Sequence, residues 1–145
     1  MMYVESIKNN KNYLEEYVIL CNYEWGTNKL TNIEEKIDNI INGDKVIEVL
    51  SLFDDDKMVG FISLFKYDGD ERHDLFPWYA TMCVKKEYRG RGYSKILNNA
   101  LLEKARELGY KKIYLKSELK NYYEKFGAKY MSLLSNGEKL YYIDL

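Results

Sequence analysis

The sequence predicts a single α/β domain of the α+β type over residues 1–145, with a mixed and mostly antiparallel central sheet and helices on both of its faces. Three observations lead to this prediction. A chain of 145 residues, 46% hydrophobic and 31% charged, suits one globular domain with its own core. Apolar runs rich in β-branched and aromatic residues follow one another across short polar turns, as antiparallel strands do. Residues 78–116 have the pattern strand, helix, strand, and a crossover of that length predicts a right-handed parallel pair.

Two helices are expected near the N-terminus. Residues 1–7 leave open whether the chain starts with a short strand or with a lead-in to the first helix. From about Lys11 the apolar residues have helical spacing, and Gly26 supplies a stop. The residues with this spacing are Leu14, Val18, Cys21 and Trp25.

The second helix is expected to begin at a capping box and to end at a glycine. Thr31-Asn32-Ile33-Glu34 has the capping-box pattern, and Gly43 is expected to be a left-handed residue just past the helix. The isoleucines that fall on one face of this helix are Ile33, Ile37, Ile40 and Ile41. We expect both helices to cover the same face of the sheet.

Further strands and an acidic loop are expected next. Residues 45–53 and 58–67 are apolar runs that flank the polar turn 54–57, so they are expected to pair antiparallel. Residues 68–75 form a polar, acidic loop, and residues 78–84 are expected to be the fourth strand.

The C-terminal half is expected to continue with a helix over residues 94–108, which ends at Gly109, and a strand over residues 112–116. A short helix is expected from about residue 117 to 125. The last element is a hairpin of residues 129–134 and 139–145, because Asn136-Gly137 between them is a strong hairpin signal.

A basic turn with two glycines, Arg89-Gly90-Arg91-Gly92-Tyr93-Ser94, joins the fourth strand to the long helix. Glycines let backbone N–H groups approach a ligand closely, and a helix N-terminus adds partial positive charge. Arg89 and Arg91 add full charges, so the turn suits a phosphate or pyrophosphate. The third glycine of the dinucleotide-binding motif is absent, and so is the Gly-Lys-Ser/Thr of the P-loop, which excludes those two classes.

This turn resembles the Arg/Gln-x-x-Gly-x-Gly/Ala motif of the GCN5-related N-acetyltransferase (GNAT) superfamily. One helix and one strand later, Tyr122-Tyr123-Glu124-Lys125-Phe126-Gly127-Ala128 resembles that family's Phe-Tyr-Glu-Lys-x-Gly-Phe segment. The resemblance implies a sheet whose parallel fourth and fifth strands splay apart. It also implies an enzyme that transfers an acetyl group from acetyl-CoA directly to a primary amine in a ternary complex.

The resemblance further implies which residues bind the coenzyme. The pyrophosphate would lie against Arg89, Gly90, Arg91, Gly92, Tyr93 and Ser94, and the pantetheine arm would follow Met82, Cys83 and Val84. Lys116 stands where the family often has an asparagine that contacts the coenzyme after the fifth strand. Asn121 is the candidate to replace that contact.

Tyr123 is the catalytic candidate. It aligns with the family's tyrosine that gives a proton to the departing thiolate, and a phenol with a pKa near 10 is matched to that role. The competing interpretation is that Tyr122 and Tyr123 only pack as aromatic side chains.

Five residues are weaker candidates for the acceptor site. Asp68 and Asp70 could attract a cationic substrate or act as a general base, although a charged loop is usually only solvated. Trp25, Trp78 and Tyr79 could form a wall of the acceptor pocket, although core packing is the more common role of such aromatic residues.

Composition and charge exclude several partners. A net charge of −1 and a pI of about 5.9 argue against nucleic acid and anionic membranes as partners. Cys21 and Cys83 are far apart and have no CxxC spacing, so neither a disulfide framework nor a metal site is expected. No signal-like or spanning apolar segment is recognised, and a cytoplasmic location is expected.

The acceptor favoured by the sequence is a small cationic amine. A peptide amine, at a protein N-terminus or a lysine side chain, is the second choice, and a homodimer is compatible with either. An alternative from a different class is a coenzyme A-binding sensor or interaction module that has lost catalysis. Tyr123 distinguishes the two classes, because an inactive relative has little reason to keep a phenol at that position.

Overall fold

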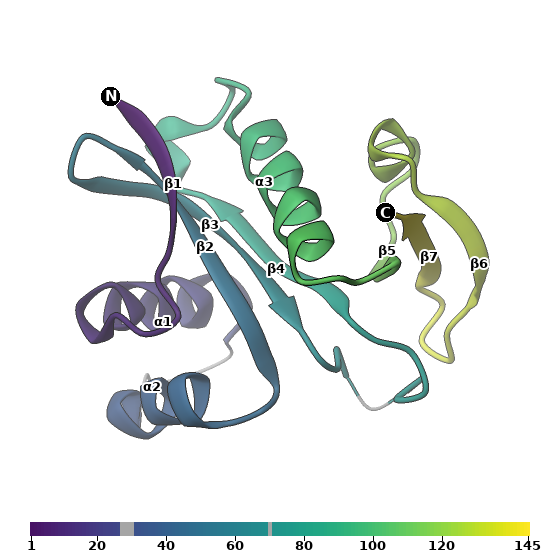
Figure 1. Cartoon of the computed structure of the whole chain (residues 1–145), viewed down its shortest axis with the longest axis horizontal. Helices are drawn as coiled ribbons and strands as arrows, with labels where there is room; N and C mark the ends of the chain where they lie inside the picture. Colours follow the sequence, from purple (N-terminus) through teal and green to yellow (C-terminus); the bar gives the residue numbers. More distant parts are fainter. Residues whose placement is uncertain (27–30, 70) are drawn as a thin grey trace.

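The computed structural model describes residues 1–26, 31–69 and 71–145, which form one mixed sheet with helices on both faces (Figure 1). The order of strands in the sheet is β1-β2-β3-β4-β5-β7-β6. The strands are β1 (Met2–Ser6), β2 (Val46–Asp54), β3 (Lys57–Phe65), β4 (Trp78–Val84), β5 (Lys112–Ser117), β6 (Lys129–Leu133) and β7 (Lys139–Asp144). The helices are α1 (Lys11–Trp25), α2 (Ile33–Asn42) and α3 (Tyr93–Glu107), with 3₁₀ turns η1 (Lys86–Tyr88) and η2 (Tyr123–Phe126).

The sheet is antiparallel except at its centre. β1 to β4 form an antiparallel meander, which shows that residues 1–7 begin with a strand. β4 and β5 are parallel and joined through α3, as the strand, helix, strand pattern predicts. β7 lies between β5 and β6, so the C-terminal hairpin completes one side of the sheet.

Two cores lie on opposite faces of the sheet. α1 and α2 cover one face with side chains such as Leu14, Val18 and Ile37, as expected for these two helices. α3 covers the other face with Leu97, Leu101 and Ala105 (Figure 1). Full burial of each leucine contributes about 2 kcal/mol through removal of apolar surface from water. Packing of helices on both faces holds β4 and its neighbouring strands in place.

The start and end of α2 differ from the prediction. The helix begins at Ile33, and its N-cap is Asn32 and not Thr31. A capping box needs a glutamate at the third helical position, whereas Glu34 is at the second, so Thr31 and Glu34 form no capping box. Asn32 has a φ of 55° and makes no side-chain capping bond among the described residues. Gly43 is extended, with a φ of −81°, and is not the expected left-handed residue.

The segment after β5 also differs from the prediction. Residues 117–125 were expected to form a short helix, but Ser117 ends β5 and helical structure is confined to the 3₁₀ turn η2. The Ser117 hydroxyl accepts a hydrogen bond from the Leu119 N–H at 3.0 Å. Side-chain bonds of this kind favour a turn over a helix.

Candidate functional site

The parallel strands β4 and β5 separate soon after they begin. Trp78 and Tyr114 are their one register pair in the described chain, and the Tyr114 N–H donates to the Pro77 carbonyl at 3.0 Å. β3 and β7, on the outer sides of this pair, remain hydrogen-bonded along most of the length of β4 and β5. The expected splay is therefore present, and it leaves the β5-facing edge of β4 open beyond Trp78.

The turn between β4 and α3 has the geometry of an anion site. Gly90 and Gly92 have φ values of 78° and 80°, the left-handed region that favours glycine. Within the described chain, a Cβ added at either glycine would meet no atom within 4 Å, so space lies open beside the backbone. No described side chain caps α3. The N–H groups of its first turn, which have no partner inside the helix, are thus available to a ligand.

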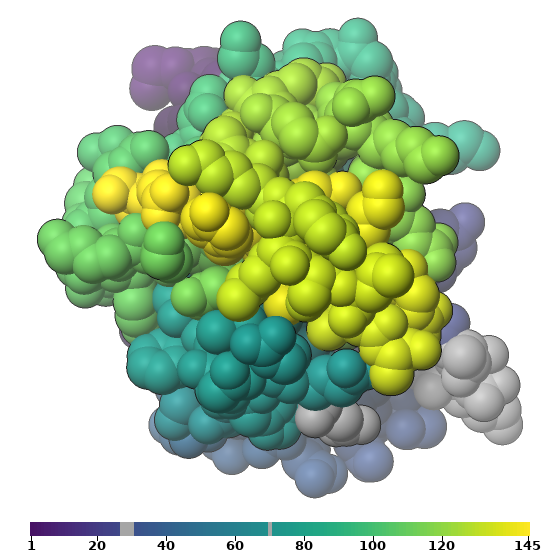
Figure 2. Space-filling view, turned by 90° about the vertical axis from the view of Figure 1, so that its right-hand side faces the viewer, coloured from purple at the N-terminus to yellow at the C-terminus, as the bar shows by residue number. Residues whose placement is uncertain are grey.

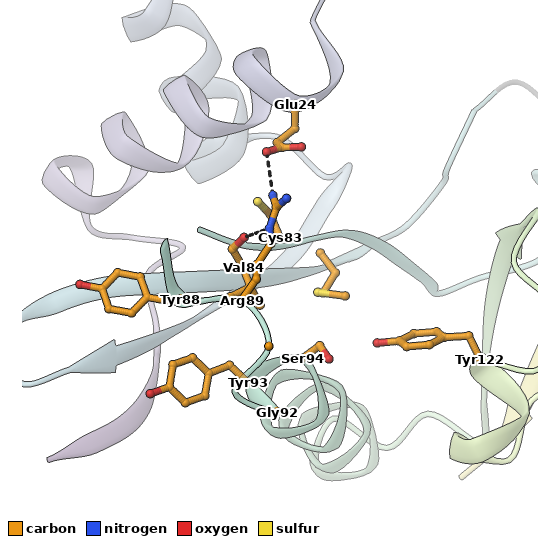
Figure 3. A pocket seen from close by; sticks show the side chains of 11 residues that line it. Glu24, Cys83, Val84, Tyr88, Arg89, Gly92, Tyr93, Ser94 and Tyr122 are labelled. Atoms are coloured by element: carbon orange, nitrogen blue, oxygen red, sulfur yellow. Dashed lines mark hydrogen bonds and ion pairs between the residues drawn. The ribbon is translucent and has the colours of Figure 1, made fainter. Parts of the chain in front are cut away.

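A cavity of about 400 Å³ lies against this turn, and we call it the glycine-loop cavity (Figure 3). Its lining residues are Glu24, Met82, Cys83, Val84, Tyr88, Arg89, Gly90, Gly92, Tyr93, Ser94 and Tyr122. Eight of these were predicted from the sequence to bind the coenzyme. Of the other two predicted contacts, Arg91 and Asn121 are outside this lining among the described residues, and both are exposed.

The guanidinium groups of the two arginines of the turn are bonded to partners within the protein. Arg89 Nε donates to the Val84 carbonyl oxygen at 2.8 Å, and its Nη2 donates to a Glu24 carboxylate oxygen at 3.1 Å (Figure 3). The Arg91 guanidinium stacks over the Tyr88 ring at 5.4 Å and donates to the Glu87 carbonyl oxygen. Arg89 lines the cavity but its guanidinium is paired with Glu24, and Arg91 lies outside the described lining, so in this state neither guanidinium is arranged as a phosphate ligand.

A second cavity, of about 450 Å³, lies between β4 and β5, and we call it the inter-strand cavity. Its lining residues are Trp25, Asp68, Tyr79, Ala80, Thr81, Met82, Lys116, Tyr123 and Glu138. Met82 lines both cavities, so they meet at this residue. The structure thus brings together Tyr123, Asp68 and Trp25, three candidates that are far apart in the sequence.

The C-terminal hairpin brings the acidic groups of the inter-strand cavity together. It packs beside the loop that follows β3, as Figure 2 shows. The Ser135 N–H donates to the Glu71 carboxylate at 3.1 Å across this contact. Asp68 from the loop and Glu138 from the hairpin turn consequently line one cavity together with Lys116 of β5.

The charges in the inter-strand cavity perturb one another. Burial raises the pKa of Asp68 above its ordinary range, and the ammonium groups of Lys116 and Lys45 oppose this rise. Lys116 Nζ lies 4.0 Å from the Asp68 carboxylate. Burial also raises the pKa of Tyr123, whose hydroxyl therefore stays protonated at neutral pH. A carboxylate with a raised pKa and a phenol in one cavity are suited to accept and to donate a proton.

A third cavity, of about 470 Å³, adjoins the inter-strand cavity on the side of α1 and α2, since Trp25 and Thr81 line both. Its wall is mostly apolar and includes Val18, Ile40 and Phe65. At its border the hydroxyls of Tyr17, Ser63 and Thr81 bond to one another at 2.8–3.1 Å. The inter-strand cavity therefore has apolar space next to its charged groups.

The two remaining acceptor-site candidates are Trp78 and Asp70. Trp78 is 1% exposed and packs against Leu134 and Leu140, while its indole N–H donates to the Leu75 carbonyl at 2.8 Å. The ring of Trp78 therefore belongs to the core, the more common role of such a residue, and Trp78 is outside the described lining of the inter-strand cavity. Asp70 lies outside the described residues.

The cysteines and acidic residues form no metal centre in the described chain. Cys21 and Cys83 are unbridged, and burial raises the pKa of the Cys21 thiol to about 12 and that of Cys83 above its ordinary value. No group of three or more His, Cys, Asp or Glu residues among the described positions is arranged to hold a metal ion. None of the described helices is long and apolar enough to cross a membrane.

Several residues at the two cavities escaped prediction as functional residues, among them Tyr122, Glu24 and Glu138. Tyr122 lies one residue before Tyr123, yet its hydroxyl points into the glycine-loop cavity (Figure 3), on a wall separate from that of Tyr123. Glu24 and Glu138 come from α1 and from a hairpin turn, and only the fold brings them to the site. Tyr79, by contrast, was a weaker candidate for the pocket wall, and it lines the inter-strand cavity. The paired tyrosines of the second motif were the one signal that could have indicated Tyr122.

Comparison with known proteins agrees with this geometry. The family model described as "Acetyltransferase (GNAT) family" matches residues 11–128. No curated protein sequence matches the chain. At identities of 16–18%, the similar solved structures show the fold.

Three of these structures cover nearly the whole chain. An N-acetyltransferase from Staphylococcus aureus Mu50 is 17% identical with a TM-score of 0.73, covering 99% of this chain and 98% of its own. An aminoglycoside 6'-N-acetyltransferase complexed with coenzyme A is 18% identical with a TM-score of 0.72, covering 98% and 96%. The PaiA N-acetyltransferase from Thermoplasma acidophilum, in complex with coenzyme A, is 16% identical with a TM-score of 0.66, covering 100% and 99%.

Proposed function

The chain belongs to the GNAT acetyltransferase family and is an acetyl-CoA-dependent N-acetyltransferase, and we propose that its acceptor is a small cationic amine bound in the inter-strand cavity. The observation behind the acceptor class is the charge of that cavity. Among the described lining residues, Asp68 and Glu138 supply two carboxylates and Lys116 one ammonium, while the Lys45 ammonium acts on Asp68 from outside the lining. Such a site favours a cation over an anion or a neutral amine.

The glycine-loop cavity fits the coenzyme. The uncapped first turn of α3 and the open space at Gly90 and Gly92 suit a pyrophosphate. The open edge of β4 near Met82 offers backbone groups to the pantetheine arm in the place of a neighbouring strand, while the Val84 carbonyl oxygen already accepts from Arg89 Nε. The residues that would hold acetyl-CoA are therefore the turn residues 89–94 and the β4 residues 82–84, with Tyr122 opposite them.

Acetyl-CoA supplies an activated thioester, whose carbonyl carbon an amine attacks and whose thiolate leaves. The backbone N–H groups on the open edge of β4 are placed to donate to the thioester oxygen as negative charge develops on it. Asp68 accepts the proton that the ammonium of the acceptor must lose before attack. Tyr123 donates its phenolic proton to the thiolate sulfur, while the attacking nitrogen loses its second proton to the medium, from which Tyr123 regains its own. The amide and a free thiol result.

The environment of Tyr123 supports a role in proton transfer better than a role in aromatic packing alone. Its ring packs edge-on against Tyr79 and Tyr122, but its side chain also lines a cavity that contains a carboxylate with a raised pKa. A purely structural tyrosine has no need of that neighbour. The arrangement also argues against the alternative of a coenzyme sensor without catalysis, because a sensor needs no proton donor or acceptor.

The proposal is tested by calorimetric titration with acetyl-CoA together with a thiol-release assay over a panel of acceptors. The panel contains polyamines, aminoglycosides, amino acids, neutral amines with apolar groups and N-terminal peptides. Aminoglycosides are included because one similar structure is an aminoglycoside 6'-N-acetyltransferase. Fast thiol release with a small cationic amine, weakened by Glu138→Gln mainly through KM, is the expected result.

Three other outcomes of these experiments would change or contradict the proposal. Turnover with peptides alone would replace the small amine by a protein N-terminus or lysine as acceptor. Tight binding of acetyl-CoA without turnover on any amine would favour the sensor. Absence of binding would contradict the assignment of the glycine-loop cavity.

A further inference from the structure

The hydroxyl of Tyr79 is buried without a hydrogen-bond partner among the residues that the structure describes. Its side chain is 5% exposed and comes from β4, where it packs in the core beneath α3. Burying a hydroxyl without a partner costs free energy, and a phenylalanine would fill the same space without that cost. Packing therefore accounts for the ring of Tyr79 but not for its oxygen.

Tyr79 lies beside the candidate proton donor. Its ring meets the Tyr123 ring edge-on, with centroids 5.3 Å apart and planes at 78°. Both side chains line the inter-strand cavity. The other polar groups that act on the Tyr79 hydroxyl are Tyr122 and Asn98, and the Asn98 amide donates one of its two N–H groups to the Ser94 carbonyl oxygen at 2.7 Å.

We propose that Tyr79 is a positioning residue whose hydroxyl donates a hydrogen bond to the Tyr123 oxygen when Tyr123 transfers its proton to the thiolate. This inference rests on the proposed role of Tyr123. In the step, the Tyr123 O–H bond breaks and an S–H bond forms on the thiol product. The negative charge moves from sulfur to the Tyr123 oxygen, where the Tyr79 O–H stabilises it until a proton returns from the medium.

The electrostatic environment fits this division of roles. Burial raises the pKa of Tyr79 well above its ordinary value, so Tyr79 keeps its proton and can only donate. Burial also raises the pKa of Tyr123, and the neighbouring Tyr79 hydroxyl opposes that rise. The nearest charged groups of the cavity are Asp68, Lys116 and Glu138, and none of them contributes to the shifted pKa of either phenol.

The test is a double-mutant cycle on thiol release with Tyr79→Phe, Tyr123→Phe and the double variant. We expect Tyr79→Phe to lower kcat about tenfold or more, with unchanged acetyl-CoA affinity and an equal or higher Tm. In the Tyr123→Phe background the same change should have no further effect. Tyr141→Phe is the matched control, because Tyr141 is a core tyrosine outside the described lining of both cavities.

Three results would overturn the inference: wild-type activity in Tyr79→Phe, an equal loss in both backgrounds, or a loss of acetyl-CoA affinity in place of kcat. A second measurement does not depend on turnover. With 3-fluorotyrosine at position 123, ¹⁹F NMR should show a higher pKa for that residue after Tyr79→Phe, and an unchanged pKa would also overturn the inference. If the wild type releases no thiol with any amine, the proposed function fails, while the ¹⁹F titration still decides the Tyr79–Tyr123 bond.

Discussion

Arg89 is paired with Glu24, with 3.1 Å between the guanidinium Nη2 and a carboxylate oxygen. The same guanidinium donates through Nε to the Val84 carbonyl at 2.8 Å. These two bonds tie the glycine turn to β4 and to the last turn of α1. Arg89 therefore holds the shape of the turn in this state, and Glu24 places a negative charge at the wall of a cavity that fits a pyrophosphate.

Glu24→Gln should tighten acetyl-CoA binding. The substitution removes a charge that repels the pyrophosphate and releases the Arg89 guanidinium from its carboxylate partner. Because both side chains are partly exposed, the gain should be modest, about two- to fivefold in Kd, and smaller at high salt. Calorimetric titration at two salt concentrations measures it. Glu103→Gln, which breaks an exposed pair with Arg106, is the control and should leave Kd unchanged; weaker binding by Glu24→Gln would contradict the interpretation.

Gly92→Ala should weaken acetyl-CoA binding about tenfold. A φ of 80° strains any residue with a Cβ by roughly 1–2 kcal/mol, so the turn is expected to change shape. Gly109→Ala is a matched control, because Gly109 follows α3 with a φ of 89° and, like Gly92, has no described atom within 4 Å of an added Cβ. Both variants should lose similar thermal stability in a melting experiment. Only Gly92→Ala should change Kd, and equal effects on Kd would show that the turn is not the binding site.

Asp68→Asn should remove the fall in kcat/KM at low pH. The raised pKa of Asp68 means that its carboxylate loses the ability to accept a proton at a pH above the ordinary Asp range. The wild type should therefore lose activity as the pH falls through that raised pKa. Asn cannot accept a proton, so kcat/KM of the variant should be lower by about 10² or more and should not fall further at low pH. A pH profile with an unchanged acidic limb would exclude Asp68 as the base.

The same carboxyl should affect the stability of the fold. A raised pKa means that the folded protein holds this proton more tightly than the unfolded chain. The free energy of unfolding should thus fall as the pH rises from the ordinary Asp range through the raised pKa. Asp68→Asn removes this pH-dependent loss of stability. The Tm of the variant should therefore exceed that of the wild type at neutral pH and approach it at low pH. A lower Tm at neutral pH would show that the Lys116 pair outweighs the cost of burial.

Local patterns predicted most of the fold. The antiparallel pair around residues 54–57, the parallel unit of residues 78–116 and the Asn136-Gly137 hairpin all follow from hydrophobic period and turn chemistry. The glycine turn was predictable for the same reason, since its function depends on contiguous residues. Of the ten predicted coenzyme contacts, the two outside the cavity are an exposed arginine and a residue in an irregular segment.

The acceptor side of the site was harder to predict because the residues that form it are far apart in the sequence and come together only through strand pairing. Between Ile62 and Leu64 of β3 and their partners Met82 and Tyr79 of β4, β4 contains one residue more. Such a bulge changes which side chains face which side. The bulge lies between Tyr79 and Met82, so strand alternation alone could not reveal which residues of this stretch line the cavity. Glu138 reaches the site only because β7 inserts between β5 and β6.

The paired tyrosines of η2 and its N-cap should separate into two functions. Tyr123 lines the inter-strand cavity, and Tyr122 lines the glycine-loop cavity. Tyr122→Phe should therefore weaken acetyl-CoA binding severalfold and leave kcat near that of the wild type. Each variant removes one oxygen from a partly buried ring, so the two are matched in their effect on packing.

The most direct test is single-turnover thiol release by wild type, Tyr122→Phe and Tyr123→Phe, at saturating acetyl-CoA and with the best amine of the panel. A proton donor acting on the thiolate predicts a loss of about 10² or more for Tyr123→Phe with an unchanged acetyl-CoA Kd. Tyr122→Phe should release thiol at nearly the wild-type rate. Full activity of Tyr123→Phe, or a large loss in Tyr122→Phe instead, would contradict Tyr123 as the donor.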